Sequence, residues 1–170
     1  ARVLIIGLAP AAHGANRTGR MFTGDQSGRW LYRALHKAGF ANQPTWERRD
    51  DGLKLTDCYI TAVCHCAPPG NKPVPAEIEN CSGYLRAELA RLKNLRMVVA
   101  LGRIAFDQYR RLTGLRDLTF GHNRLYPTRP VLIASYHPSR QNTNTGKLTE
   151  PMLDAVFAQA RALASINEQA

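Results

Sequence analysis

The chain has 170 residues, of which 44% are hydrophobic, and this is enough material for one domain with a complete core. Its formal net charge is +10, and residues 103–147 hold eight basic side chains against two acids, so the composition favours a polyanionic partner such as nucleic acid. No apolar run reaches the roughly 18 residues of a membrane-spanning helix, so we expect no membrane partner.

The first predicted element is a strand at residues 3–6, because a continuous apolar run rich in β-branched residues is typical of a strand buried on both faces. A long loop of glycine and small residues follows over 7–25, with one acid, Asp25, and one bulky aromatic side chain, Phe22. A helix is expected next, with Ser27 as its N-cap, through Phe40. A central strand that opens into such a loop is where open α/β sheets place their ligand sites.

The middle of the chain predicts one further strand and one further helix. Residues 41–56 are polar and interrupted by proline and glycine, which indicates a connection with little core of its own. The β-rich run 58–64 predicts a second buried strand. Four prolines and a glycine in residues 66–75 exclude regular structure there, and Pro75 is suited to begin a helix that runs to about residue 93. The expected apolar face of that helix comprises Ile78, Leu85, Leu89 and Leu92.

The last part of the chain again alternates strand and helix. We expect a strand at 97–101, a helix at 104–112, an irregular stretch with a short strand near Leu125, and a buried strand at 131–135. A polar loop over 140–149 and a final helix should follow. Pro151 would be the first residue of that helix, and its buried residues would be Met152, Val156, Leu163 and Ile166.

This alternation predicts a single domain over residues 1–170 with a three-layer α/β/α fold and a mainly parallel central sheet. Three loops with unusual residues follow predicted strands, at 7–25, 66–75 and 137–149. The carboxyl ends of parallel strands meet at one edge of a sheet, so these loops are expected to converge into one site.

Three sequence segments carry a resemblance to a known family. They are GLAPAAHGANRTGRMFTGD at 7–25, Tyr-His-Pro-Ser at 136–139, and Cys-x-Pro-Pro-x-Asn-Lys-Pro from Cys66, followed by Cys81. Together they resemble the type B branch, family five, of the uracil-DNA glycosylase superfamily, over residue 3 to about 165. The first segment is long and distinctive, so chance is a poor explanation for the match.

The resemblance implies a uracil-DNA glycosylase-like fold and a monofunctional DNA glycosylase of base-excision repair. Such an enzyme flips a damaged base out of the stack and hydrolyses its N-glycosidic bond. The expected substrates are uracil and other deaminated bases such as hypoxanthine, in double- or single-stranded DNA, and the protein is expected to act as a monomer.

Three residues are the candidates for catalysis. His137 could donate a ring N–H to a carbonyl oxygen of the departing base, and Asp25 could orient a water or offset the positive charge on the sugar. Asn71 could hold the base or the water. Each has a structural alternative: His137 tied into its loop or bound to phosphate, Asp25 as a helix cap, and Asn71 in an Asx turn.

The remaining site predictions concern the base pocket and the DNA. The residues expected around the base are Gly7, Leu8, Ala9, Phe22 and Ala62, with Phe22 stacked on the flipped base. Ala62 stands where some branches carry an Asn that recognises uracil, which fits a broader substrate range. The residues expected to contact DNA are Ser139, Arg140, Gln141 and Asn142, and the sequence leaves open which of them enters the duplex.

The four cysteines are crowded into residues 58–81, which does not suggest a secreted disulfide scaffold and favours a cytoplasmic protein. The resemblance implies that Cys66 and Cys81 are two ligands of a four-iron, four-sulfur (4Fe-4S) cluster. Such a cluster needs four thiolates, and the family's first two lie ahead of the first strand, so we expect a segment upstream of residue 1. Cys58 and Cys64 are expected to be buried thiols; the alternative is that all four cysteines form a site of their own.

Two other functions are compatible with this pattern. One is a protein of the same fold that binds lesions but catalyses weakly. The other is a nucleotide-binding α/β protein with phosphates on the glycine-rich loop, although residues 7–25 lack the Gly-Lys-Ser/Thr ending of a P-loop and the glycine spacing of a dinucleotide site.

Overall fold

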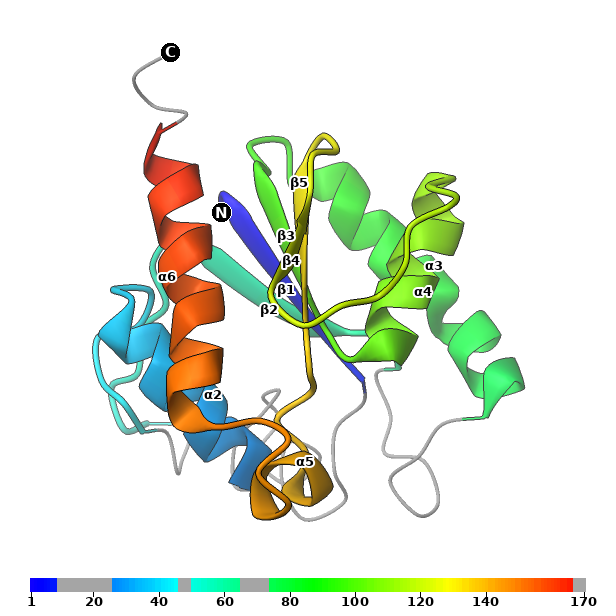
Figure 1. Ribbon diagram of the computed structural model, residues 1–170. Helices are drawn as coiled ribbons and strands as arrows, with labels where there is room; N and C mark the ends of the chain where they lie inside the picture. The colour runs from blue at the N-terminus through cyan, green and yellow to red at the C-terminus, as the bar shows by residue number, and fades with distance from the viewer. Residues whose placement is uncertain (9–25, 46–49, 65–73, 167–170) are drawn as a thin grey trace.

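The computed structural model describes residues 1–8, 26–45, 50–64 and 74–166. Within them a five-stranded sheet has the order β2-β1-β3-β5-β4 and lies between two layers of helices (Figure 1). The parallel strands are β1 (Val3–Gly7), β2 (Cys58–Ala62), β3 (Met97–Leu101) and β5 (Val131–Ser135). At one edge, β4 (Arg124–Tyr126) runs antiparallel to β5. The predicted α/β/α class with a mainly parallel sheet is confirmed.

The helices divide between the two faces of the sheet. One face is covered by α2 (Gln26–Lys37) and α6 (Glu150–Ile166), and the other by α3 (Pro75–Arg91) and α4 (Arg103–Thr113) (Figure 1). A short helix, α5 (Arg140–Asn144), lies beyond the carboxyl end of β5. Within the described residues, none of the helices is both long enough and apolar enough to cross a membrane.

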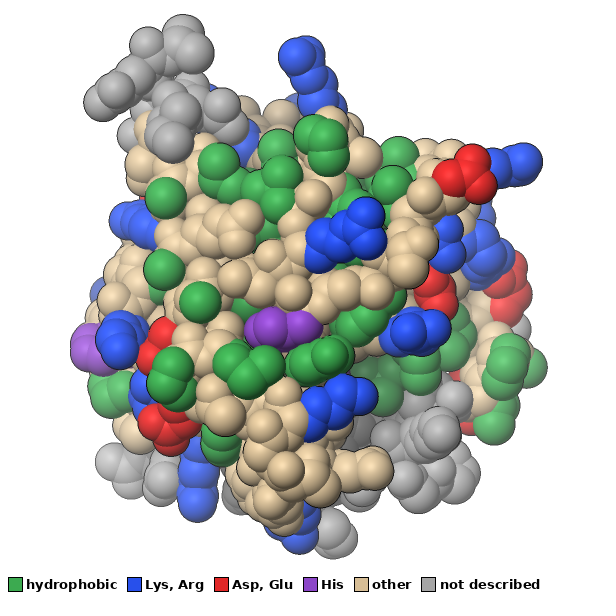
Figure 2. All heavy atoms as spheres, in the orientation of Figure 1, with side chains coloured by type: hydrophobic (Ala, Val, Ile, Leu, Met, Phe, Trp, Pro, Cys, Tyr) green, Lys and Arg blue, Asp and Glu red, His purple; other side chains and the backbone are tan. Residues whose placement is uncertain are grey.

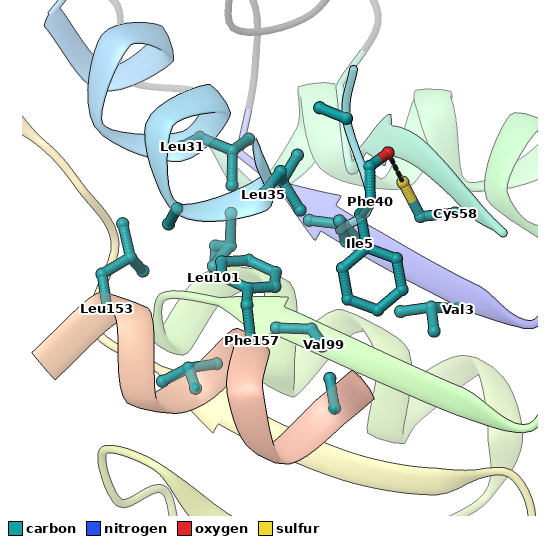
Figure 3. Close-up of a cluster of buried hydrophobic side chains, with 14 of the residues drawn as sticks. Val3, Ile5, Leu31, Leu35, Phe40, Cys58, Val99, Leu101, Leu153 and Phe157 are labelled. Carbon is teal, nitrogen blue, oxygen red and sulfur yellow. Dashed lines mark hydrogen bonds between the residues drawn. The ribbon is translucent and has the colours of Figure 1, made fainter. Parts of the chain in front are cut away.

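Two hydrophobic clusters form because alternate residues of a strand point to opposite faces. Val3, Ile5 and Val99 pack with α2, α6 and the ring of Phe40 (Figure 3). Leu4, Ile6 and Val98 point the other way, toward α3 and α4. Every residue of β1 and β3 is buried, as the continuous apolar runs predict.

The second strand differs from its prediction. It ends at Ala62, two residues early, and it is not buried throughout, since Tyr59 is 44% exposed. The reason is its position at the edge of the sheet, where it pairs with β1 alone among the described strands. The preceding connection also contributes more core than expected, because Leu53 and Ala41 are buried and Ala41 bridges Leu55.

Several helix boundaries also differ. Helix α2 begins at Gln26 and ends at Lys37, so Ser27 is not its N-cap, although Phe40 is buried as expected. In α6 the Thr149 hydroxyl accepts the Met152 N–H, which makes Pro151 the second helical residue. The buried residues of α6 are Leu153, Val156, Phe157, Ala160 and Ala164, while Met152 and Leu163 lie at the margin and the side chain of Ile166 is outside the described part.

The predicted loop at 140–149 begins instead with helix α5. Its N-cap is Ser139, whose hydroxyl oxygen accepts the Asn142 N–H at 3.1 Å. The five helical residues have no apolar stripe, so their periodicity could not reveal a helix. This cap fixes the chain directly after His137.

Candidate functional site

A cavity of about 660 Å³ opens at the carboxyl edge of the sheet. Its walls come from Leu8 after β1, Gly102 and Arg103 after β3, and Tyr136 and His137 after β5. The other lining residues are Leu101, Ile104, Phe120, Gly121, Ser139, Gln141, Asn142 and Lys147. The described parts of the loops after β1 and β5 therefore converge, as predicted, and the start of α4 joins them.

The backbone around His137 is held from both sides. The Tyr136 N–H donates to Nδ1 of His122 at 3.0 Å. The His137 carbonyl accepts from Nδ2 of Asn142 at 2.9 Å. These bonds fix the peptide that precedes Tyr136 and the peptide that follows His137, so the backbone is held on both sides of the His137 ring.

Gly102 allows a close approach of β3 to His137. Its φ is +93°, which favours glycine, and a Cβ placed there would lie 3.2 Å from the His137 Cβ. The Gly102 N–H donates to the Ser135 carbonyl at 2.7 Å, which ties this turn to the end of β5. A side chain at position 102 would therefore displace His137 or strain the turn.

The electrostatic surroundings keep the His137 ring neutral. Burial lowers its pKa from the usual 6.5 to about 4, because the charged form loses its hydration. A neutral imidazole still carries one ring N–H and can donate a single hydrogen bond. At neutral pH His137 is therefore suited to donate a hydrogen bond to a developing anion.

Aromatic rings and cations form the wall next to His137. The Phe120 and Tyr136 rings lie 6.2 Å apart, and the His122 ring stacks on Tyr136 at 4.7 Å between centroids. The Lys147 ammonium lies 4.8 Å from the Tyr136 ring centre, and the Arg103 guanidinium 5.6 Å from that of Phe120. The side chains of Arg103 and Lys147 are exposed, so they are available to a polyanion at the cavity mouth.

Sequence reasoning missed most of this wall. Phe120 and His122 fall in the irregular stretch before β4, which has no periodicity to show where its side chains point. The sequence shows Arg103 and Lys147 as basic residues but does not indicate that they lie beside the site. The signal that could have been used is Gly102, a glycine that directly ends a buried strand.

Two residues expected in the base pocket are the last residues of their strands. Gly7 and Ala62 face each other in the register of β1 and β2, and Ala62 is 1% exposed. Within the described part of the chain, Leu8 lines the cavity while Gly7 and Ala62 do not. Predictions for Asp25, Asn71, Ala9, Phe22 and Cys66 lie outside the described residues.

The segment expected to contact DNA divides into two kinds of residue. Gln141 lines the cavity, and Arg140 is exposed at the start of α5. Ser139 and Asn142 also line it, but they are engaged in the helix cap and in the bond to the His137 carbonyl. Both of these residues therefore have a structural role in addition to any contact with DNA.

The described cysteines differ in how deeply they are buried. Cys58 and Cys64 are buried, as expected, and the Cys58 thiol points to the Phe40 carbonyl at 3.9 Å (Figure 3). Burial raises the pKa of Cys58 to about 12, which disfavours the thiolate that a metal requires. Cys81, on α3, is half-buried. Among the described residues, no three His, Cys, Asp or Glu side chains gather into a metal-binding group.

The charge is unevenly distributed around the site. Figure 2 shows Lys and Arg side chains across the middle of the face that bears β5 and α5, with acidic side chains toward its two sides. Some cations are paired on the surface, such as Arg110 with Asp107 and Arg111 with Glu79. None of the described residues that line the cavity is acidic.

The sequence model of the uracil DNA glycosylase superfamily matches residues 1–161. The chain is 50% identical to the type-5 uracil-DNA glycosylase of Mycobacterium bovis, over 97% of this chain and 64% of that protein. It is 48% identical to the type-5 enzyme of Thermus thermophilus (98% and 77% covered) and 47% identical to that of Pyrobaculum aerophilum (95% and 72%). The chain thus spans just under two thirds of the Mycobacterium bovis relative.

Proposed function

This chain belongs to the uracil DNA glycosylase superfamily, and from that membership we propose that the protein hydrolyses the N-glycosidic bond of uracil in DNA. The observation that carries the proposal is His137, whose ring is kept neutral in a cavity at the carboxyl edge of the sheet. A site of about 660 Å³ has room for one base that has left the stack.

The reaction replaces a carbon–nitrogen bond with a carbon–oxygen bond. The bond between the sugar C1′ and the base breaks, the base leaves with the electron pair, and water supplies hydroxide to C1′ and a proton to the base. The His137 N–H donates to the uracil carbonyl oxygen on which negative charge develops. A neutral donor is suitable here, because it stabilises the anion without first having to bind a proton.

The opposite charge develops on the sugar, and Asp25 is the residue proposed to meet it. As a carboxylate it orients the attacking water and offsets the oxocarbenium character of the sugar. Asn71 is proposed to position the base or that water through its amide. Support for both comes from the resemblance of the segments that carry them.

We propose that the DNA backbone binds across the basic face that surrounds the cavity. Arg103 and Lys147 flank the entrance, and Arg140 is exposed beside it. Cations in such positions bind phosphates without reading sequence. The protein is proposed to act as a monomer on double- or single-stranded DNA, to accept other deaminated bases such as hypoxanthine, and to be cytoplasmic.

We further propose that Cys66 and Cys81 are two of the four thiolate ligands of a 4Fe-4S cluster. The chemistry of Cys81 fits, because its thiol is half-buried on α3 and is not in a disulfide, and cluster iron takes thiolate ligands. When bound, the cluster would stiffen the segment that carries Asn71.

Iron and sulfide analysis tests the cluster. The purified protein is expected to contain about four of each per chain, and Cys81→Ser should lower both contents and the visible absorbance. Cys58→Ala, which removes a core thiol, is the matched control and should keep the cluster. An iron-free protein of full activity would contradict this assignment.

A base-release assay tests the function itself. The protein is incubated with strands or duplexes that carry one uracil or one hypoxanthine, without added metal, and abasic sites are then cleaved with alkali. Strand breaks that depend on the alkali step are expected. No breaks from a protein that still binds the lesion would indicate a lesion-binding protein, and tight binding of free nucleotides without DNA affinity would indicate a nucleotide-binding protein.

A further inference from the structure

We propose that His122 is a positioning residue for His137 and that it does this work only as a neutral imidazole. The inference rests on the proposed function in one respect, namely that His137 acts on the substrate. His122 itself does not line the cavity among the described residues. Its effect passes through Tyr136.

The direction of one hydrogen bond defines the required form of His122. The Tyr136 N–H donates at 3.0 Å, so Nδ1 of His122 must be the unprotonated acceptor and Nε2 must carry the hydrogen. The two rings are also stacked, 4.7 Å apart and 21° from parallel. His122 therefore holds both the peptide N–H and the side chain of the residue directly before His137.

Of the groups around the stack, the two cations also favour the neutral form. Lys147 lies over the Tyr136 ring, and Arg103 lies over Phe120, which packs against Tyr136. At the start of α6, Asp154 and Glu150 pair with Arg33 on α2. Burial lowers the pKa of His122, while the Met152 backbone acts in the opposite direction.

Protonation of His122 would remove the acceptor. Two N–H groups would then face each other, and the Tyr136 peptide would have to turn away. The Asn142 bond would still hold the far side of His137, so the residue would be anchored at one end. The protein should therefore lose base release on acidification as His122 binds a proton.

Two variants at position 122 test the hydrogen-bond acceptor of His122 and its stacking ring separately. In His122→Asn, the amide oxygen takes the place of Nδ1 and does not titrate in this range. In His122→Phe, the stacking ring remains and the acceptor is gone. We expect His122→Asn to keep most of the single-turnover rate and to lose the acid limb of the pH profile that the protonation of His122 produces. His122→Phe should slow the chemical step about tenfold at neutral pH with little change in DNA affinity.

Unequal effects of the two variants support the proposal, after circular dichroism has shown that both are folded. Equal losses in both variants, or an unchanged acid limb in His122→Asn, would overturn it. A readout without activity is the amide proton of Tyr136 in a nuclear magnetic resonance titration. Its shift should follow the protonation of His122 in the parent and stay constant in His122→Asn.

The magnetic resonance measurement does not depend on base release. It therefore distinguishes a failure of the proposed function from a failure of the positioning role of His122. A protein that releases no uracil would contradict the proposed function and leave the coupling between His122 and Tyr136 measurable. A Tyr136 amide that ignores the titration of His122, in a protein that does release uracil, would overturn the positioning role alone.

Discussion

His137 combines a backbone held by hydrogen bonds on both sides with a half-buried and neutral ring. Its folded pKa of about 4 lies below the unfolded value near 6.5, so the unfolded chain binds the proton more readily between these values. The free energy of unfolding should therefore fall as the pH drops from about 6.5 to about 4. The same group that suits catalysis near neutrality destabilises the fold in acid.

Chemical denaturation at a series of pH values measures this effect. Between pH 7 and pH 4, His137 should account for at most roughly 3 kcal/mol of lost stability. His137→Asn should show a smaller decline over that range. Parallel curves for the parent and His137→Asn would contradict the assigned pKa.

Among the candidate catalytic residues, a substitution of Asp25 should slow base release the most relative to its effect on DNA affinity. Asp25→Asn keeps the size of the side chain and removes its charge. Base release should fall by at least about a hundredfold, while affinity for DNA should change by less than about threefold. Single-turnover rates and equilibrium binding to the same uracil-containing duplex give the two numbers. Intact turnover would show that Asp25 has no role in the reaction.

At the scale of elements, helix α5 holds the loop after β5 in place through two hydrogen bonds, and we call this arrangement a brace. Ser139 caps the helix, and the first helical turn returns Asn142 to the His137 carbonyl. Ser139→Ala removes the cap oxygen and should lower the free energy of unfolding by about 1 kcal/mol. Because the brace also holds His137, base release should fall as well.

Denaturant unfolding and base release measure these two effects of Ser139→Ala together. Thr145→Ala is a matched control, because it removes a hydroxyl at the opposite end of α5, where it donates to the Gln141 and Asn142 carbonyls and takes no part in the N-cap. A Ser139→Ala protein with lower stability and unchanged base release would show that the cap does not brace His137.

The elements differ in how far the sequence could predict them. The runs that became β1 and β3 are apolar and buried on both faces, so their local pattern was sufficient. The burial of β2 depended on its place at the sheet edge, which only the strand order shows. Helix α5 is polar, and its existence depends on a cap and on tertiary bonds.

The residues of the candidate site also differ in how far the sequence could predict them. His137 stands directly after a clear strand and within a distinctive motif, so both its place and its chemistry could be inferred. Phe120 reaches the site, and His122 stacks on Tyr136 behind it, from an irregular stretch where side-chain direction follows from tertiary packing. Close approach at Gly102 likewise becomes visible only when β3 and β5 lie side by side.

At the scale of the whole molecule, the net charge of +10 should appear in the salt dependence of DNA binding. If Arg103 and Lys147 each neutralise one phosphate, Arg103→Gln and Lys147→Gln should each reduce the slope of log affinity against log salt by about 0.9 on duplex DNA. The double variant should lose about twice that, since the two cations are independent contacts.

Affinity for DNA at several salt concentrations provides the measurement. Arg129→Gln is the matched control, because Arg129 is exposed in the turn between β4 and β5, at the end of β5 opposite to His137. Equal slopes for all the variants would mean that the backbone of the DNA does not pass the cavity entrance.

The order of the strands also has a consequence for how the molecule folds. Leu8, Gly102 and His137 stand far apart in the sequence, and they meet because β1, β3 and β5 pair in parallel. Parallel pairs need long crossover connections, so these contacts are closed late and together. Activity should therefore return during refolding in the same kinetic phase as the sheet, and a piece of the chain without β1 should have no partially working site.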